Sequence, residues 1–231
     1  MRAIHVADLA LVRLLRFASP VLPVGAFSYS QGLESAVEQG WVRDEASARR
    51  WLGDVLALSQ GGFEAPVWCR CYRAWEAGNV DAVRQWNDVF LAARESAEFR
   101  AETVQMGYSL RQLLTDGGEF NEPQLSQLRA VQDPAFPTSF SFACAAWCIP
   151  QRQALLGYLW AWLENQVSAA MKIIPLGQMS GQRLLAALSE ALPGLADAAL
   201  VMDDEELTNC TPGLAIASCR HESQYSRLFR S

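Results

Sequence analysis

Apolar side chains recur every three or four residues along most of this chain, which is the spacing of one face of an α-helix. The stretch 96–115 places Phe99, Met106 and Leu110 at helical spacing, and 151–174 is apolar on most sides. A helix of the second kind is expected at the centre of a core. No convincing alternation of apolar and polar residues, the mark of a half-buried strand, is found. The pattern predicts an all-α fold, a single-domain helical bundle of roughly ten helices.

Residues that cap or interrupt helices divide this pattern into elements. Side chains of Asp, Asn and Ser accept hydrogen bonds from the first amides of a helix, and the predicted N-caps of this kind are Asp44, Asn79 or Asp81, Ser96 and Asn121. Paired glycines favour helix ends, so helices are predicted to end at Gly61-Gly62 and at Gly117-Gly118.

After the first helical stretch, the pattern is interrupted by a turn that contains two prolines. Pro20 and Pro23 fix φ and lack the backbone donor, so no helix runs through them. Gly25 can adopt the positive φ that such turns often need. Ser28 and Gln31 have the spacing of a capping box, which predicts that the next helix begins at Ser28.

The composition is that of an acidic protein without an evident membrane segment. The 231 residues carry a formal net charge of −6, which argues against non-specific binding to nucleic acid. The first residues lack a signal-peptide pattern. The longest nearly apolar run, 154–163, is far shorter than the roughly 20 residues of a membrane span. We therefore expect no nucleic-acid or membrane partner, a cytoplasmic location and free thiols rather than disulfides.

Few residues have the types and spacings that catalysis or metal binding requires. The two histidines, His5 and His221, are far apart in sequence, and no glycine-rich phosphate motif or H-E-x-x-H motif is present. A closed metal site uses four ligands, whereas the chain offers only the pairs Cys69/Cys71, Cys144/Cys148 and Cys219/His221. The acidic run 203–206 is typical of a solvated loop. We predict no catalytic residue, no bound metal and no cofactor.

Three separated stretches carry a more specific signal. The first is SPVLPVGAFSYSQGLESAVEQGWV at 19–42, the second is KIIPLGQ at 172–178, followed by Gly181-Gln182-Arg183, and the third is RHESQYSRLFRS at 220–231. Together they resemble the urease accessory protein family called UreF, whose members assist nickel insertion into urease. The family usually has two glycines after Pro-Val, and here the second is Ala26. A positive φ there would cost alanine about 1 kcal/mol, unless the turn relies on Gly25 alone.

The second stretch has a structural and a functional interpretation. Lys172 lies in the predicted last turn of a helix, where a cation stabilises the exposed carbonyls. The rigid Pro-Leu-Gly-Gln turn that follows could instead present Gln178, together with Lys172, to a partner.

The third stretch has the composition of a binding segment. Tyr225, Leu228 and Phe229 have helical spacing and lie beside arginines, which suits a segment that orders on docking. The alternative is that it packs onto its own domain. We favour partner binding, and we divide the chain into an all-helical domain, 1–218, and a C-terminal partner-binding tail, 219–231.

The resemblance implies a non-enzymatic component of a metallochaperone complex. Such a protein is an all-α homodimer that docks on a UreD-type scaffold, also called UreH, and recruits the UreG GTPase. It gates or modulates the GTPase, so that nickel is delivered into apo-urease. Carried over residue by residue, the resemblance implies partner-facing or dimer positions at Tyr29, Glu34, Lys172, Gln178, Arg220, Tyr225, Arg227, Leu228, Phe229 and Arg230.

Two other functions are compatible with the sequence. One is a helical small-molecule enzyme with an apolar pocket lined by Trp147, Trp160 and Trp162, which would still need an acid–base pair. The other is a protein that carries nickel directly, for which Cys219 and His221 are the nearest pair of ligands in the sequence.

Overall fold

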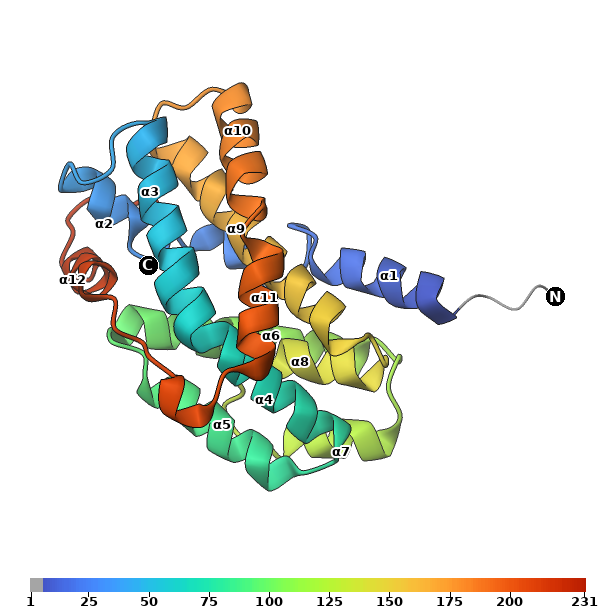
Figure 1. Ribbon diagram of the computed structural model, residues 1–231. Helices are drawn as coiled ribbons and strands as arrows, with labels where there is room; N and C mark the ends of the chain where they lie inside the picture. Colours follow the sequence, from blue (N-terminus) through green and yellow to red (C-terminus); the bar gives the residue numbers. More distant parts are fainter. Residues whose placement is uncertain (1–5) are drawn as a thin grey trace.

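The computed structural model describes residues 6–231, and residues 1–5, including His5, lie outside the description. Every regular element in the described chain is helical, which confirms the all-α prediction (Figure 1). The α-helices are α1 (Val6–Phe17), α2 (Leu33–Glu38), α3 (Glu45–Val55), α4 (Ala65–Glu76), α5 (Val80–Ala92), α6 (Ala97–Asp116), α7 (Glu122–Arg129), α8 (Phe136–Ala146), α9 (Gln151–Ile173), α10 (Gln178–Ser189), α11 (Leu192–Val201) and α12 (Pro212–His221). The helical elements of other types are η1 (Ala26–Ser28), η2 (Leu56–Glu64) and η3 (Asp204–Glu206).

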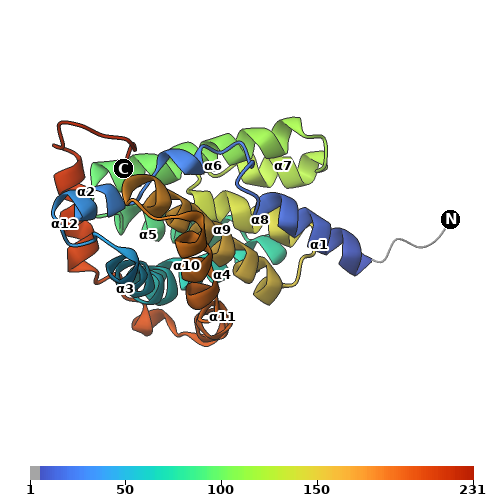
Figure 2. The same cartoon turned by 90° about the horizontal axis from the view of Figure 1, so that it is seen from above.

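Helix α9 is the central element, as its apolar sequence predicts. It packs against α1, α4, α8, α10 and α11, and its side chains Leu155, Leu159 and Leu163 have no exposed surface. The cluster of buried apolar side chains that surrounds α9 includes members from α1 through α12. Two views show α1 projecting from one side of the molecule and α12 lying on the opposite side (Figures 1 and 2).

Most of the predicted helix starts are confirmed by hydrogen bonds. The carboxylate of Asp44 accepts from the Ser47 amide at 2.8 Å, and Ser47 returns a contact to the Asp44 amide, which completes a capping box. Ser96 caps α6, Asn121 caps α7, and Asn79 rather than Asp81 caps α5. These signals could be recognised because each involves residues three apart in the sequence.

The prediction of a helix end at Gly61-Gly62 is wrong. The chain continues through both glycines as the π-helix η2, which joins α3 to α4 in one uninterrupted rod. A Cβ atom on Gly61 would lie 2.7 Å from Leu195 Cδ2, and one on Gly62 would lie 3.0 Å from the carbonyl oxygen of Thr208. The glycines therefore allow close approach of distant segments and do not break the helix.

The predicted capping box at Ser28 is also wrong. Ser28 ends the short 3₁₀ helix η1, and α2 begins five residues later at Leu33, after Gly32 with φ of 76°. Gly25 has φ of 80°, as the turn requires, and Ala26 is not among the described residues with positive φ. The turn relies on Gly25, so alanine at position 26 carries no backbone strain there.

One stretch of the described chain, Gln178–Val201, is long and apolar enough for a membrane span by length and composition. The stretch is divided into α10 and α11. Arg183 forms a two-bond ion pair with Glu45, and Asp197 forms one with Arg152. Arg183 and Asp197 are thus paired with neighbouring helices, and the leucines of the stretch contribute to the core. This pattern is typical of a surface helix pair in a helical bundle.

Candidate partner-docking site at the C-terminal segment

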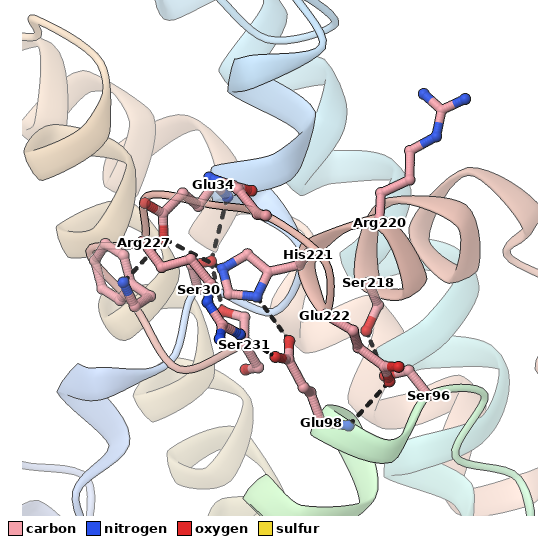
Figure 3. Close-up of polar contacts among 12 residues, drawn as sticks. Ser30, Glu34, Ser96, Glu98, Ser218, Arg220, His221, Glu222, Arg227 and Ser231 are labelled. Carbon is pink, nitrogen blue, oxygen red and sulfur yellow. Dashed lines mark hydrogen bonds and ion pairs between the residues drawn. The ribbon is translucent and has the colours of Figure 1, made fainter.

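Residues 222–231, called here the C-terminal segment, follow α12 and return across the body to α2 (Figure 3). Helix α12 packs against α2 and α6. Close approach to α2 is possible because Gly32 lacks a side chain, since a Cβ there would lie 3.2 Å from the Ser218 amide nitrogen. Buried hydroxyls of Ser96 and Ser218 are hydrogen bonded to each other. The position of α12 is therefore fixed before the segment begins.

Glu34 on α2 holds the backbone of the segment. Its Oε1 accepts from the Leu228 amide at 2.7 Å, and its Oε2 accepts from the Phe229 amide at 2.9 Å. Only 8% of Glu34 is exposed. The carboxylate therefore supplies acceptors to two backbone N–H groups that would otherwise have no hydrogen-bond partner once the segment packs on the body.

His221 is fully buried between two carboxylates. Its Nδ1 lies 2.6 Å from Glu98 Oε2, and its Nε2 lies 3.3 Å from Glu34 Oε2. Glu98 also pairs with Arg227 of the segment at 2.6 Å. The imidazole thus links α2, α6 and α12. Because both of its nitrogens contact carboxylates in a buried site, the ring holds these three helices in a fixed relative orientation.

The last residues pair with the turn that precedes α2. Ser231 places its carbonyl oxygen 2.8 Å from the Ser30 amide and 2.7 Å from the Ser30 hydroxyl, and the Arg230 amide donates to Ser28. The Ser231 hydroxyl donates to Glu102 Oε2 at 2.6 Å, and Gln31 donates to the other oxygen at 2.7 Å. The Ser30 hydroxyl therefore donates to the C-terminal segment while it accepts from the Glu34 amide in the first turn of α2, and the Gln31 side chain is bonded to Glu102 and Trp162.

Burial determines the ionisation of two groups beneath the segment. Loss of solvent raises the pKa of Glu102 to about 7. The hydrogen bonds from Ser231 and Gln31 favour the ionised form and offset part of this rise in pKa. Burial is the main reason why the pKa of Tyr29 is raised, and the nearby Glu102 carboxylate raises it further. The Arg230 guanidinium lowers the pKa of Tyr29 in part.

The outer face of the segment carries four of the five side chains that were selected within it from the sequence. Tyr225 is fully exposed, Leu228 is 65% exposed, and Arg227 and Arg230 also lie on the surface. Phe229 is the exception, because its ring is buried and lies 5.6 Å from Lys172 Nζ. The segment is not helical, so the helical spacing of its aromatic residues does not create a single apolar face.

The remaining selected residues are only partly brought together. Arg220 lies on α12, where it donates to Gln39 and stacks over Trp41. Gln178 is exposed at the start of α10, and no hydrogen bond joins it to the C-terminal segment within residues 6–231. Tyr29 and Glu34 are buried beneath the segment and are not surface residues themselves.

Sequence reasoning missed the body residues that receive the segment. Glu98 and Glu102 lie on α6, and the residues that they hold, His221 and Ser231, are more than 120 positions away in the sequence. The only available signal was that Glu102 shares the face of Phe99 and Met106, where an acidic residue needs a partner.

The cysteine pairs have the character of core thiols or isolated surface thiols. Burial raises the pKa of Cys69 and of Cys71 to about 12, which disfavours the thiolate that binds metal. Cys219 is exposed while His221 is enclosed by carboxylates. Within residues 6–231, no group of three metal-ligating side chains is close enough to hold an ion.

The three tryptophans do not line one common pocket. Trp147 stacks on Phe120, and Trp162 donates to Gln31 at 2.7 Å beneath the C-terminal segment. Trp160 is partly buried against the core. Their positions do not provide the shared apolar chamber that the enzyme hypothesis requires.

Known proteins match this chain over nearly its whole length. A family model described as UreF matches residues 42–189. A urease accessory protein UreF from Azoarcus sp. is 58% identical, with 96% of both chains covered. Proteins of the same name from Methylobacillus flagellatus and Dechloromonas aromatica are each 53% identical, covering 96% of this chain and 98% of theirs.

The family model begins after the proline-containing turn and ends before α12, so it does not include the C-terminal segment. Each of these relatives covers 96% of this chain, well beyond the part that the family model matches. With identities above 50% across almost the whole chain, this protein belongs to the UreF family of urease accessory proteins, which take part in urease maturation.

Proposed function

We propose that this protein is a non-catalytic assembly factor of the cytoplasm that docks on a UreD/UreH-type scaffold through its C-terminal segment. In this proposal, the resulting complex recruits the UreG GTPase and gates or modulates its activity, and nickel passes into apo-urease as the cargo of the complex. The protein contributes surfaces to this process and no reacting group.

The observation that supports docking is the division of the C-terminal segment into an anchored inner face and an exposed outer face. Glu34 and Glu102 hold the backbone and the last serine, while Tyr225, Arg227 and Leu228 remain available to solvent. Tyrosine and arginine are enriched among residues that dominate binding energy. A held backbone also lowers the entropy lost when a partner binds.

The predicted partner-binding tail, 219–231, includes side chains that are buried in the body of the protein. His221 and Phe229 are buried parts of the body, so removal of 219–231 would also expose α2 and α6. Substitutions on the outer face are therefore a cleaner test than truncation.

The test is co-purification with the cognate UreD-type protein, comparing the natural chain with a Tyr225→Ala, Leu228→Ala double variant. We expect the double variant to lose most of the complex and to keep its helical circular dichroism and melting temperature. The matched control is Val201→Ala, because Val201 is an exposed apolar residue on α11. Co-purification of the double variant at the natural level would overturn docking through this segment.

We also propose that the protein is a homodimer whose interface includes α1. This helix leaves Leu11, Val12 and Leu15 more than half exposed, and contiguous exposed apolar side chains are typical of association surfaces. A Leu11→Glu, Leu15→Glu double variant should reduce the mass measured by light scattering to that of one chain. Val201→Glu should leave the mass unchanged, and an unchanged mass in both would contradict the proposal.

A further inference from the structure

His221 is held in contacts that suit only one protonation state of its ring (Figure 3). Its Nδ1 lies 2.6 Å from Glu98 Oε2, its Nε2 lies 3.3 Å from Glu34 Oε2, and the residue has no exposed surface. A neutral imidazole has one N–H donor and one bare nitrogen, whereas the imidazolium has two donors. Only the imidazolium can therefore donate to both carboxylates.

A neutral ring would place a nitrogen lone pair against a carboxylate oxygen in either tautomer. With the proton on Nδ1, the bare Nε2 faces Glu34, and with the proton on Nε2, the bare Nδ1 faces Glu98. Glu34 is engaged as an acceptor, because its two oxygens accept from the amides of Leu228 and Phe229. Both ring contacts are thus attractive when each nitrogen carries a proton.

The balance of charge around the ring leads to the same protonation state. Glu34 and Glu98 contact His221, and Arg227 of the C-terminal segment pairs with Glu98 at 2.6 Å. With an imidazolium, these four side chains are neutral in sum. With a neutral imidazole, they retain one negative charge without a partner. Burial of an unpaired charge is costly, whereas water stabilises the same charge when the site is open to solvent.

The attachment of the C-terminal segment depends on these carboxylates. In the structure the segment lies on the body, which we call the closed form, and within residues 222–231 only Phe229 and Ser231 are buried. The remaining attachment is polar and includes the bonds to Glu34 and Glu98. A terminal segment with few buried apolar contacts opens at a lower cost than the core. The charge state of the site therefore influences how often the segment is open.

We propose that closure of the C-terminal segment takes up one proton, which His221 holds as an imidazolium between Glu34 and Glu98, and that loss of this proton opens the segment. The proton comes from solvent and forms a bond to a ring nitrogen. In the open form, water reaches both carboxylates and the neutral ring no longer faces a buried anion. The proposal concerns this chain alone and does not depend on docking to a partner.

A second carboxyl beneath the segment acts in the same direction. Glu102 lines a cavity of about 270 Å³ and accepts from the Ser231 hydroxyl at 2.6 Å. Burial raises the pKa of Glu102 to about 7, so below this pH the closed form holds a proton that a solvated carboxyl releases above 4.5. Glu102 therefore also favours closure as the pH falls, and its contribution must be separated from that of His221.

Other charged and titratable groups surround the two sites. Among them, Arg94 forms a buried ion pair with Glu64 at 2.8 Å and partly offsets the effect of Glu64 on Glu102. The groups from the elements around the segment are Tyr29 from the proline-containing turn, Glu34 from α2, Glu64 from η2, Glu98 and Glu102 from α6, Tyr158, Glu164 and Lys172 from α9, and Glu222, Arg227 and Arg230 from the segment itself.

The first experiment counts the protons on the His221 ring by NMR in the natural protein labelled with ¹⁵N-histidine. The chain has one other histidine, His5, which serves as the reference signal. We expect N–H signals at both ring nitrogens of His221 while the amides of Leu228 and Phe229 are protected from exchange. The second ring N–H should disappear at the pH at which this protection is lost. A single ring N–H in the protected form would overturn the proposal.

The second experiment measures how strongly the opening of the segment depends on pH. Hydrogen exchange at the Leu228 and Phe229 amides, corrected for the intrinsic effect of pH on exchange, gives the population of the open form. The measurement uses Glu102→Gln, so that Glu102 does not contribute. Linkage to one proton predicts that protection falls by about tenfold per pH unit above the midpoint. Protection that is independent of pH in this variant would contradict the proposal.

Substitution of the ring separates protonation from packing. His221→Gln, added to Glu102→Gln, keeps a polar side chain without a titrating group, and the pH dependence of protection should disappear. Glu222→Gln in the same background is the matched control, because it removes a charge from the next residue, whose carboxylate accepts from the Ala97 amide at 2.8 Å. It should keep the tenfold dependence.

A pH dependence that survives in the His221→Gln variant would assign the proton to another group and overturn the proposal. If that variant does not fold, the count of ring protons in the natural protein decides the matter.

Discussion

The two ends of the described chain differ in how regular their backbone is and in how they are attached to the body. Helix α1 has a regular backbone of 12 residues, yet within residues 8–17 only Ala10, Leu14 and Phe17 are buried in the core, whereas Leu9, Leu11, Val12 and Leu15 are exposed. The C-terminal segment has almost no regular structure, yet Glu34 and Glu102 hold its backbone and its last side chain. Regular secondary structure is therefore a poor guide to how firmly a segment is attached, because attachment depends on buried contacts.

The largest effect should come from removal of Glu34. Glu34→Ala leaves two backbone amides and one side of His221 without an acceptor in a buried site, and we expect a loss of roughly 3–5 kcal/mol in the free energy of unfolding. Urea denaturation measures the loss, and hydrogen exchange at Leu228 and Phe229 should become fast. Glu38→Ala, an exposed change on the same helix, is the control and should cost little. A small effect of Glu34→Ala would mean that apolar contacts hold the segment.

Glu102 should make the stability of the protein depend on pH. Its pKa is about 7 in the folded protein and 4.5 ordinarily, so between these values the folded state holds a proton that the unfolded state has released. The free energy of unfolding therefore falls as pH rises through this window. Glu102→Gln removes this dependence. The free energy of unfolding of the variant minus that of the natural chain should therefore increase by about 2 kcal/mol from pH 5 to pH 8. A constant difference across this range would show that Glu102 is solvated.

Helix α1 should respond to apolar truncation and not to changes in pH. Leu14 is 8% exposed and packs against Gly157 of α9, where an added Cβ would lie 2.5 Å from Leu14 Cδ1. Leu14→Ala should cost about 2 kcal/mol, measured by urea denaturation at pH 7. The exposed Leu15→Ala is the matched control and should cost less than a quarter as much. Equal costs would indicate that α1 is buried against another surface in solution.

The smallest effect on stability is expected from Arg227. Its ion pair with Glu98 is 2.6 Å long, but 40% of the Arg227 side chain is exposed, so solvent screens the attraction. Arg227→Ala should change the free energy of unfolding by about 0.5 kcal/mol. The same variant should still weaken association with a UreD-type protein, and this contrast would distinguish an interface role from a structural one.

Local signals in the sequence were sufficient for most of the fold. Asp44, Ser96 and Asn121 act on amides within their own first turn, so their function could be read from neighbouring residues. Gly61 could not be understood in this way, because the residue that needs its small size is Leu195. A glycine pair that ends a helix and one that admits a distant side chain are indistinguishable in the sequence alone.

The candidate site was predicted in its outer residues but not in its supporting ones. Tyr225 and Leu228 were selected from the resemblance, and their exposure agrees with a role at a surface. Glu34 was selected as a surface residue, whereas its carboxylate is buried and holds the segment. Such pairings join residues almost 200 positions apart, and no periodic pattern in the sequence reports on them.

The π-helix η2 sets a strict requirement on chain length in this protein. Each π turn accommodates one residue more than an α turn, and Ser59 and Glu64 reach the cavity lining from this widened stretch. Deletion of a single residue between 56 and 64 would rotate everything after it by about 100° relative to α3. Glu64 would then turn away from Arg94. During evolution, substitutions at exposed positions of this rod are tolerable, whereas insertions, deletions and side chains at Gly61 or Gly62 are expected to be eliminated by selection.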